Sequence, residues 1–376
     1  MVDALTFRNF KCFDDLRLSI KPLTLLTGFN GGGKSTSMQP LLLLTQGLRG
    51  NWGADTFALN GSLVRLGSAG DILPRGASEN RIAVQVSSND EDTEWQLEAR
   101  SGIRELAIIS GKSAKSGRRD VNWTNVIAPA SVRGSPLITS VSQLSYLSAV
   151  RGGANDAFPY PDSDSAAPNV GVLGEYAPFW LDRKVDDELD STLLNSSEPA
   201  TSIRKQLDAF LGDLFPGAQA NVLAAPQASS LTVQFRLNDE SGWQRPANIG
   251  YGLSYAFPIL VALLTSVPGQ VIVIDSPEAH LHPSAQSRMG RILAKFAVGG
   301  RRIVVETHSD HLLNGCRLAV ADQAISPDDV AIHFFAGTLS GGVTSPIIDR
   351  DGNIDAWPPG FFDQSEKDLA QLAGWD

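Results

Sequence analysis

A nine-residue stretch, GFNGGGKST at residues 28–36, constrains the fold of this chain more than any other feature. It fits the pattern G-x-x-x-x-G-K-[ST] and lies between an apolar run, residues 23–27, and a helix-like segment, residues 35–48. Glycines let such a loop turn its backbone N–H groups toward phosphate oxygens, and the following helix N-terminus adds its positive dipole end. The context predicts a strand–loop–helix unit that binds a nucleotide, and favours it over a glycine turn without a ligand.

The loop residues are the predicted ligands of that nucleotide. We expect Lys34 to neutralise the β- and γ-phosphates and the Ser35 hydroxyl to ligate Mg²⁺. The loop positions predicted to bind the nucleotide are Asn30, Gly31, Gly33, Lys34, Ser35 and Thr36.

Length and composition fit a soluble globular protein. The chain has 376 residues, 42% of them hydrophobic and 19% charged, which suffices for one large α/β core with an insertion or for two modest domains. The longest apolar runs, such as residues 257–264, fall short of the ~20 residues that span a bilayer, and residues 1–20 lack the apolar core of a signal peptide. We therefore expect a cytoplasmic protein with no membrane partner.

The net charge of −10 disfavours nucleic-acid binding by the molecule as a whole. A nucleic-acid partner would need a local basic patch, and the strongest candidate is GKSAKSGRRD at residues 111–120. No aromatic side chain interleaves with these charges to stack on bases, so a solvated loop is the favoured interpretation.

Hydrophobic patterning predicts a mixed α/β chain. Residues 1–27 alternate as two or three strands, and residues 152–167 form a Gly-, Asp- and Pro-rich loop at the edge of an insertion. Further strands are predicted at 63–66, 81–87, 95–99, 104–109, 230–237, 271–274 and 302–305, and helices at 181–194, 203–214, 254–265 and 283–296. Two apolar strands that flank one helix form a βαβ unit, which predicts a parallel sheet in the C-terminal third.

Two further motifs end apolar strands. VIVID at residues 271–275 delivers Asp275 to the carboxyl end of a strand, where doubly wound sheets bind their ligands. Alone, such an aspartate is as often structural, but with the glycine loop it is expected to hold Mg²⁺ through water. VVETHSDH at residues 304–311 places His308 at the same edge, where its imidazole could reach the γ-phosphate.

The order of the glycine loop, Asp275 and His308 resembles the ABC-type ATPase superfamily, in its stand-alone RecF- and SMC-like branch. IDSPEAHLHPSAQ and VVETHSDHLLNGCR are similar to a bacterial group of short AAA/ABC-like ATPases that carry a C-terminal domain of unknown function, and residues 351–372 resemble that domain. The resemblance extends from residue 5 and is weakest over residues 111–230.

The resemblance implies an α/β fold: an ABC-type P-loop ATPase core with a mixed or parallel sheet, an antiparallel β flank and a helical insertion. On this basis we expect four parts. They are an N-terminal ATPase lobe with the P-loop and the β flank (1–150), a loop and mainly helical insertion (151–235), a C-terminal ATPase lobe with the remaining motifs (236–335) and a small C-terminal domain (336–376).

In such ATPases a signature loop of one subunit completes the nucleotide site of the other, so the resemblance implies ATP, Mg²⁺ and a head-to-tail homodimer or higher homo-oligomer. NIGYGLSYAFPIL at residues 248–260 opens a helix at the expected place, and Gly250, Gly252 and Ser254 would face the γ-phosphate of the partner. A plain helix cap is the alternative. The resemblance also implies a glutamine that senses Mg²⁺, for which Gln143 is the candidate.

One departure from the family bears on the mechanism. The family residue that follows the Asp275 position and polarises the attacking water is commonly Glu, but here it is Ser276. A serine hydroxyl cannot act as a general base near neutral pH. Glu278 is therefore the candidate water-positioning carboxylate, with help from His308, and we expect slow ATP turnover.

By resemblance, relatives sit beside nucleases or other effectors in bacterial defence against phage. We therefore expect an ATPase that regulates or scaffolds an effector partner, a nuclease or toxin encoded nearby. The alternative is a DNA-binding repair or clamp ATPase of the RecF type, with Arg301 and Arg302 adding to a basic groove. A transporter subunit is disfavoured.

A metal-dependent nuclease is the remaining alternative. Four of the five histidines gather in two motifs with acidic neighbours: His280, His282, His308 and His311, beside Glu278 and Asp310. These residues are already accounted for by the ATPase loops, and the second acidic cluster of nuclease-fused relatives is not expected here.

Overall fold

A computed structural model of the chain describes residues 1–100, 102–162, 167–225, 227, 229–337 and 342–374. Its first sheet is antiparallel, with the strand order β2–β1–β5–β6–β7–β4 and β8 beside β7. The bounds of these strands are β1 Ala4–Phe10, β2 Phe13–Ser19, β4 Thr56–Ala58, β5 Arg81–Ser87, β6 Glu91–Ala99, β7 Glu105–Lys115 and β8 Val121–Trp123. This sheet is the β flank expected from the alternating patterns.

The second sheet carries the chemistry-bearing motifs, in the order β16–β15–β3–β14–β13–β9. Its strands are β3 Leu23–Gly28, β9 Ser145–Leu147, β13 Val271–Asp275, β14 Arg302–Glu306, β15 Val330–Phe335 and β16 Val343–Thr344. All neighbouring pairs are parallel except β15 with β16. The carboxyl ends of β3, β13 and β14 therefore meet at one edge, as the βαβ pattern predicts.

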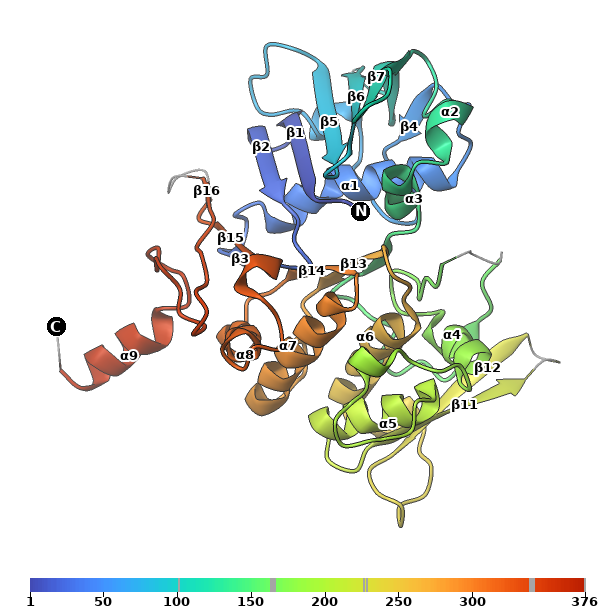
Figure 1. Cartoon of the computed structure of the whole chain (residues 1–376), viewed down its shortest axis with the longest axis vertical. Coiled ribbons are helices and arrows are strands. Elements are labelled where there is room, and N and C mark those ends of the chain that lie inside the picture. The colour runs from blue at the N-terminus through green and yellow to red at the C-terminus, as the bar shows by residue number, and fades with distance from the viewer. Residues whose placement is uncertain (101, 163–166, 226, 228, 338–341, 375–376) are drawn as a thin grey trace.

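Helix α1, Lys34–Arg49, lies between the two sheets (Figure 1). Its leucines pack with the antiparallel sheet and with Val273 and Val304 of the parallel sheet. Ile272 and Ile303, one residue earlier on the same strands, point to the opposite face and join the core under α6 Tyr251–Thr265, α7 Pro283–Val298 and α8 Asp310–Ala321. The alternation gives the parallel sheet two buried faces. The short helices α2 Ala130–Arg133 and α3 Pro136–Ser142 precede β9.

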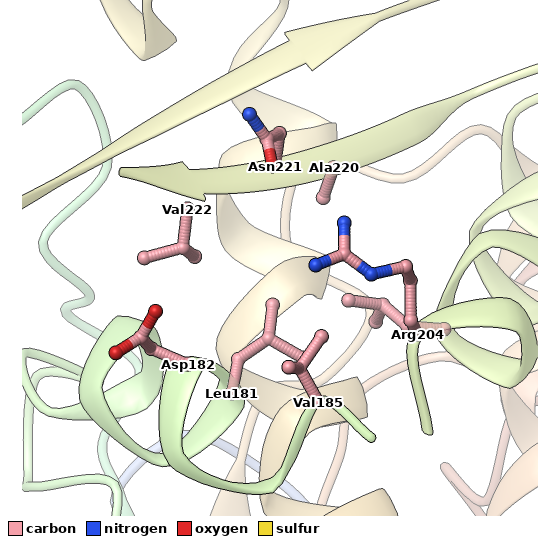
Figure 2. Close-up of a pocket in the computed structure, with 8 residues that line it drawn as sticks. Leu181, Asp182, Val185, Arg204, Ala220, Asn221 and Val222 are labelled. Carbon is pink, nitrogen blue, oxygen red and sulfur yellow. The ribbon is translucent and has the colours of Figure 1, made fainter. Parts of the chain in front are cut away.

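The segment between β9 and α6 combines helices with a small antiparallel sheet of order β10–β12–β11. Its elements are β10 Phe158–Pro159, α4 Ala177–Lys184, α5 Ile203–Leu214, β11 Gln219–Ala225 and β12 Ser230–Arg236. Helix α5 packs on α7 through Phe210 and Phe296, whose ring centroids lie 5.4 Å apart. A hollow of about 20 Å³ lies between α4, α5 and β11 (Figure 2), which is room for about one water molecule.

The last described segment packs against the nucleotide-loop edge of the parallel sheet. Phe361 is fully buried, and its ring lies 5.4 Å from that of Phe334 in β15. Gly360 has a φ of +85°, and a Cβ there would lie 2.0 Å from the ring of Phe29. Helix α9, Gln364–Leu372, follows this contact and extends from the body in Figure 1.

The mixed α/β fold expected from the sequence is confirmed, but three expected segments differ. Residues 111–115, expected in a solvated loop, continue strand β7 instead. No strand forms at residues 63–66, because the Asn60 side chain bonds both the N–H and the carbonyl of Gly67 and closes a turn. The helix expected at 181–194 ends at Lys184, and Asp190 then caps a short 3₁₀ turn by accepting from the N–H of Thr192.

Candidate functional site

The glycine loop joins β3 to α1 at the carboxyl edge of the parallel sheet. Gly28 has a φ of +129°, and a Cβ there would meet the carbonyl oxygen of Phe335 at 2.3 Å, so only glycine fits. Gly33 caps α1 with a φ of +106° and no side-chain cap, which leaves the first amides of α1 free for an anion.

The Lys34 side chain is buried inside this loop. Its ammonium donates hydrogen bonds to the carbonyl oxygens of Gly28 (3.0 Å) and Phe29 (2.8 Å), and burial lowers its pKa. Asn30, Gly31 and Ser35 are exposed and Thr36 is half-buried, so the outer rim of the loop is open to a ligand. The arrangement holds one buried positive charge inside a loop whose outer residues are exposed.

Two carboxylates end adjacent strands beside the loop. Asp275 of β13 pairs in register with Glu306 of β14, and Ser35 donates a hydrogen bond from Oγ to Glu306 Oε1 at 2.9 Å. The Ser276 hydroxyl donates to Asp275 Oδ1 at 2.8 Å. Ser35, Asp275 and Glu306 line one cavity of about 140 Å³, together with Gln39 and Tyr146.

Glu306 was missed by the sequence reasoning. Burial, followed by the nearby charge of Asp275, raises the pKa of Glu306 to about 7, and the Ser35 hydrogen bond and Lys34 only partly oppose this. The signal was present in the sequence, because VVE ends in an acid after apolar residues as VIVID does.

Arg151 was also missed, and it holds the turn after β13. It is 4% exposed, and its Nη2 donates to the carbonyl oxygens of Asp275 (2.5 Å) and Ser276 (3.1 Å). Its Nε and Nη1 are buried without a hydrogen-bond partner, and burial lowers its pKa to about 10. The guanidinium lies 5.6 Å from the ring centroid of Tyr255. A lone arginine after a three-residue strand gave no sequence signal.

Glu278 and His308 are joined through the backbone. Glu278 Oε1 accepts a hydrogen bond from the N–H of His308 at 2.9 Å, and burial raises the pKa of Glu278. The other carboxylate oxygen of Glu278 is buried without a partner. Burial, and then the charge of Lys34, lowers the pKa of His308. The imidazole is exposed, so it remains accessible at the edge of the site.

The signature-like segment opens α6. Gly250 is the N-cap and is exposed, as is Tyr251. A Cβ on Gly252 would lie 2.6 Å from the carbonyl oxygen of His280, so this helix end packs closely on the loop after β13. Ser254 is only 8% exposed and faces a small interior hollow.

Gln143 is not brought to the carboxylates. It follows α3, and its carbonyl accepts a hydrogen bond from Gln270. The parallel pairing of β9 with β13 places Ser145 opposite Ile272. Gln143 precedes Ser145, so it lies at the amino end of these strands, whereas Asp275 lies at the carboxyl end. Gln39, one turn after Ser35 on α1, lines the carboxylate cavity instead, and its Oε1 is buried without a partner.

The histidines do not assemble a metal site in the described part of the chain, where no group of three or more His, Cys, Asp or Glu side chains could hold a metal ion. His280 packs against the Tyr255 ring, 4.5 Å between centroids. His282 caps α7 by accepting from the N–H of Ser284. His311 lies 3.8 Å from Asp310.

The basic residues proposed for a nucleic-acid groove are largely committed elsewhere. Arg301 is 5% exposed and bonds Ser266, and Arg302 pairs with Asp3 at 2.6 Å. In the hairpin of β7 and β8, Lys112 pairs with Asp120 at 2.8 Å.

The carboxylate cavity has the donor chemistry of a magnesium site. Ser35, Gln39, Asp275 and Glu306 offer hydroxyl, amide and carboxylate oxygens, the hard ligands that Mg²⁺ prefers, and the unpartnered Gln39 oxygen is an open acceptor there. When bound, Mg²⁺ would neutralise phosphate charge beside Lys34.

Parts of the chain are similar to known families and proteins. Residues 166–314 match the family model of an AbiEii-type AAA domain, Type IV TA system, and residues 325–372 match that of a protein of unknown function, DUF3696. An OLD nuclease of Thermus scotoductus is 23% identical over 333 residues, which cover 82% of this chain and 59% of the relative. The chain thus spans less than two thirds of that protein.

Among solved structures, the Smc head domain of Pyrococcus furiosus, with an extended coiled coil and bound to the C-terminal domain of ScpA, aligns over 99% of both chains with a TM-score of 0.51. Its sequence identity of 11% shows a shared fold. The described residues contain no helix long and apolar enough to cross a membrane.

Proposed function

Since this chain is an ABC-type, SMC-like ATPase with a C-terminal domain of unknown function, we propose that it binds ATP and Mg²⁺ in the cytoplasm and hydrolyses the nucleotide slowly. The observation that carries the proposal is that the glycine loop and the metal-ligand candidates lie at the same edge of the parallel sheet. There the Lys34 ammonium lies under the loop carbonyls, while Ser35 and Asp275 line the adjacent oxygen-rich cavity.

The second part of the proposal is a head-to-tail dimer around ATP. The N-terminus of α6 supports it, because Gly250 and Tyr251 are exposed and Gly250 offers no side-chain cap to the first amides of the helix. An uncapped, exposed helix N-terminus is suited to an anion held by a second copy of the chain.

Slow hydrolysis follows from the residues after Asp275. The Ser276 hydroxyl donates to Asp275 and cannot remove a proton from water. Glu278 is the remaining carboxylate of the turn, and one of its oxygens is held by the His308 amide. Its free oxygen would orient water without the open access of a typical general base.

The proposed output is a shape change passed to an effector, a nuclease or toxin, in defence against phage. The match to an AbiEii-type domain supports this role by analogy. The alternative, a DNA-binding clamp ATPase of the RecF type, gains no support from Arg301 and Arg302, which are already paired.

The proposal is tested by molar mass from light scattering, with and without ATP and Mg²⁺, and with phosphate release followed on the same samples. We compare wild type with Lys34→Ala, and use Lys205→Ala, an exposed lysine on α5, as the matched control. The expected result is a nucleotide-dependent doubling of mass in wild type and Lys205→Ala but not in Lys34→Ala.

A mass that does not respond to nucleotide in wild type would refute the ATP-closed dimer. Rapid phosphate release would refute slow turnover and leave the dimer standing. Absence of ATP binding by wild type would overturn the proposed function itself.

A further inference from the structure

The parallel sheet places a second acid, Glu306, beside the carboxylate expected to hold the metal. Asp275 and Glu306 are partners in the register of β13 and β14. Val273 and Val304, two residues earlier on each strand, both face α1, and side chains alternate along a strand, so the two acids also project toward α1.

Helix α1 completes the enclosure from the opposite side. Ser35 in its first turn donates its hydroxyl proton to Glu306 Oε1 at 2.9 Å. Gln39, one turn later on the same helix, presents an amide oxygen that is buried and has no hydrogen-bond partner. These four side chains border one cavity of about 140 Å³.

A purely structural role explains neither Glu306 nor Gln39. A structural acid at this depth would be expected to pair with a basic side chain, but the partner of Glu306 in the described structure is the neutral Ser35 hydroxyl. A buried amide oxygen without a partner is likewise costly unless a ligand or ordered water meets it.

We propose that Glu306 and Gln39 belong to the metal site: Glu306 acts as a second carboxylate for the nucleotide-bound Mg²⁺, and Gln39 supplies the amide oxygen for which Gln143 is too far away. The inference rests on the proposed function. Mg²⁺ is commonly held by one or two carboxylates plus phosphates and waters, so the two strand-end acids, with the helix hydroxyl and the amide oxygen, fit the protein ligands of such a site.

The arrangement has two consequences. The Ser35 hydroxyl donates only its proton to Glu306, so its oxygen lone pairs stay available and could ligate the metal without loss of that hydrogen bond. The two acids repel one another when no cation is present, so neutralising one should weaken cation binding without weakening the phosphate grip of Lys34.

The test measures binding of Mn²⁺, a spectroscopic substitute for Mg²⁺, to the protein–ADP complex by electron paramagnetic resonance. ADP affinity is measured in parallel in EDTA with a fluorescent ADP analogue. The isosteric variant is Glu306→Gln, and Gln39→Leu tests the amide oxygen. Glu105→Gln is the control for the loss of one acid, because Glu105 is an exposed residue of β7 that does not line the cavity.

We expect Glu306→Gln to weaken Mn²⁺ binding about 10- to 100-fold and Gln39→Leu to weaken it less, while ADP affinity in EDTA stays within about twofold of wild type. Glu105→Gln should keep wild-type Mn²⁺ affinity. Circular dichroism establishes folding of each variant, and Glu306→Asp, with its shorter carboxylate, should recover part of the affinity and so separates a lost ligand from a damaged fold.

The outcomes distinguish this inference from the proposed function. If wild type binds both ADP and Mn²⁺ but Glu306→Gln binds Mn²⁺ equally well, the inference is overturned and the ATPase stands. If wild type binds neither, the proposed function falls. Equal loss of Mn²⁺ affinity in Glu306→Gln and Glu105→Gln would also overturn the inference, because the effect would then come from the total charge of the protein.

Discussion

Ser276 occupies the position next to Asp275 with a φ of +50° and its hydroxyl bonded to Asp275 Oδ1. Ser276→Glu would place a carboxylate beside the site of the attacking water. General-base catalysis typically contributes ~10²–10⁴-fold, so we predict that single-turnover phosphate release rises at least ~10²-fold. Ser276→Gln, with the same size and no basic oxygen, should stay near the wild-type rate. Equal rates for the two variants would show that residue 276 does not limit hydrolysis.

Glu306 also predicts how stability depends on pH in the metal-free protein. Folding raises its pKa from 4.5 to about 7, so the folded state binds the proton more tightly than the unfolded state. Stability from this group is therefore full below pH 4.5, is lost as pH rises toward about 7, and changes little above.

In EDTA, urea denaturation across pH 5–8 should show wild type losing stability relative to Glu306→Gln, by on the order of 1–3 kcal/mol in total. A pH-independent difference between the two proteins would show that the Glu306 carboxyl does not titrate with a raised pKa.

At the residue scale, the sequence was informative where the backbone dictates the residue. Gly28 and Gly33 made the loop recognisable in the sequence, because their positive φ angles and close contacts leave no room for a side chain. Arg151 and Gln39 act through three-dimensional proximity to Asp275, which no local pattern encodes. The roles expected for Gly250, Gly252 and Ser254 concern a second copy of the chain and stay predictions.

At the scale of elements, helices α7 and α8 pack backbone against backbone at Gly290 and Gly315. A Cβ on Gly290 would lie 2.3 Å from the carbonyl oxygen of Leu312. We predict that Gly290→Ala forces the helices apart and destabilises the protein by ~1–3 kcal/mol in urea denaturation. The shift would also displace the loop that carries His308, which directly precedes α8.

Gly212 on α5 is the control for that substitution, because a Cβ there meets nothing within 4 Å. Gly212→Ala removes glycine from a helix at no steric cost and should stabilise the protein by up to ~1 kcal/mol. Destabilisation of equal size by both variants would argue against close packing of α7 on α8.

The βαβ unit around α7 was predictable because β13 and β14 are apolar runs separated by one amphipathic helix. β15 is a short buried run that is apolar except for His333, and periodicity alone does not separate such a run from a buried helix. β9 has only three residues, so the sequence did not predict this strand, and Gln143 was chosen as the metal-sensing glutamine from the family resemblance alone.

At the scale of the whole molecule, the C-terminal segment supports the nucleotide loop through aromatic rings. Phe361 is fully buried against Phe334, and the Phe334 ring lies 5.8 Å from that of Phe29 in the loop. A cleft of about 840 Å³ lies between the glycine loop and helix α9. The domain of unknown function is therefore in contact with the site that is proposed to bind ATP.

We predict that Phe361→Ala lowers the free energy of unfolding by ~3–5 kcal/mol. The variant should also bind a fluorescent ATP analogue more weakly, because Phe334, which contacts Phe29, loses its own contact with Phe361. Leu372→Ala, at a side chain that is 85% exposed, should change neither quantity. Destabilisation by Phe361→Ala with unchanged nucleotide affinity would mean that the C-terminal segment stabilises the fold without supporting the loop.

The place of β3 in the parallel sheet bears on how the protein is made. Its neighbours are β14 and β15, which leave the ribosome long after it, whereas the antiparallel sheet is complete once residue 123 has emerged. Until residue 306 follows, a nascent chain exposes both backbone edges of an apolar strand, and one edge stays open until residue 335. Chaperone shielding is expected there. The cradle for phosphate does not exist during most of translation, so ATP cannot template the folding of its own binding site.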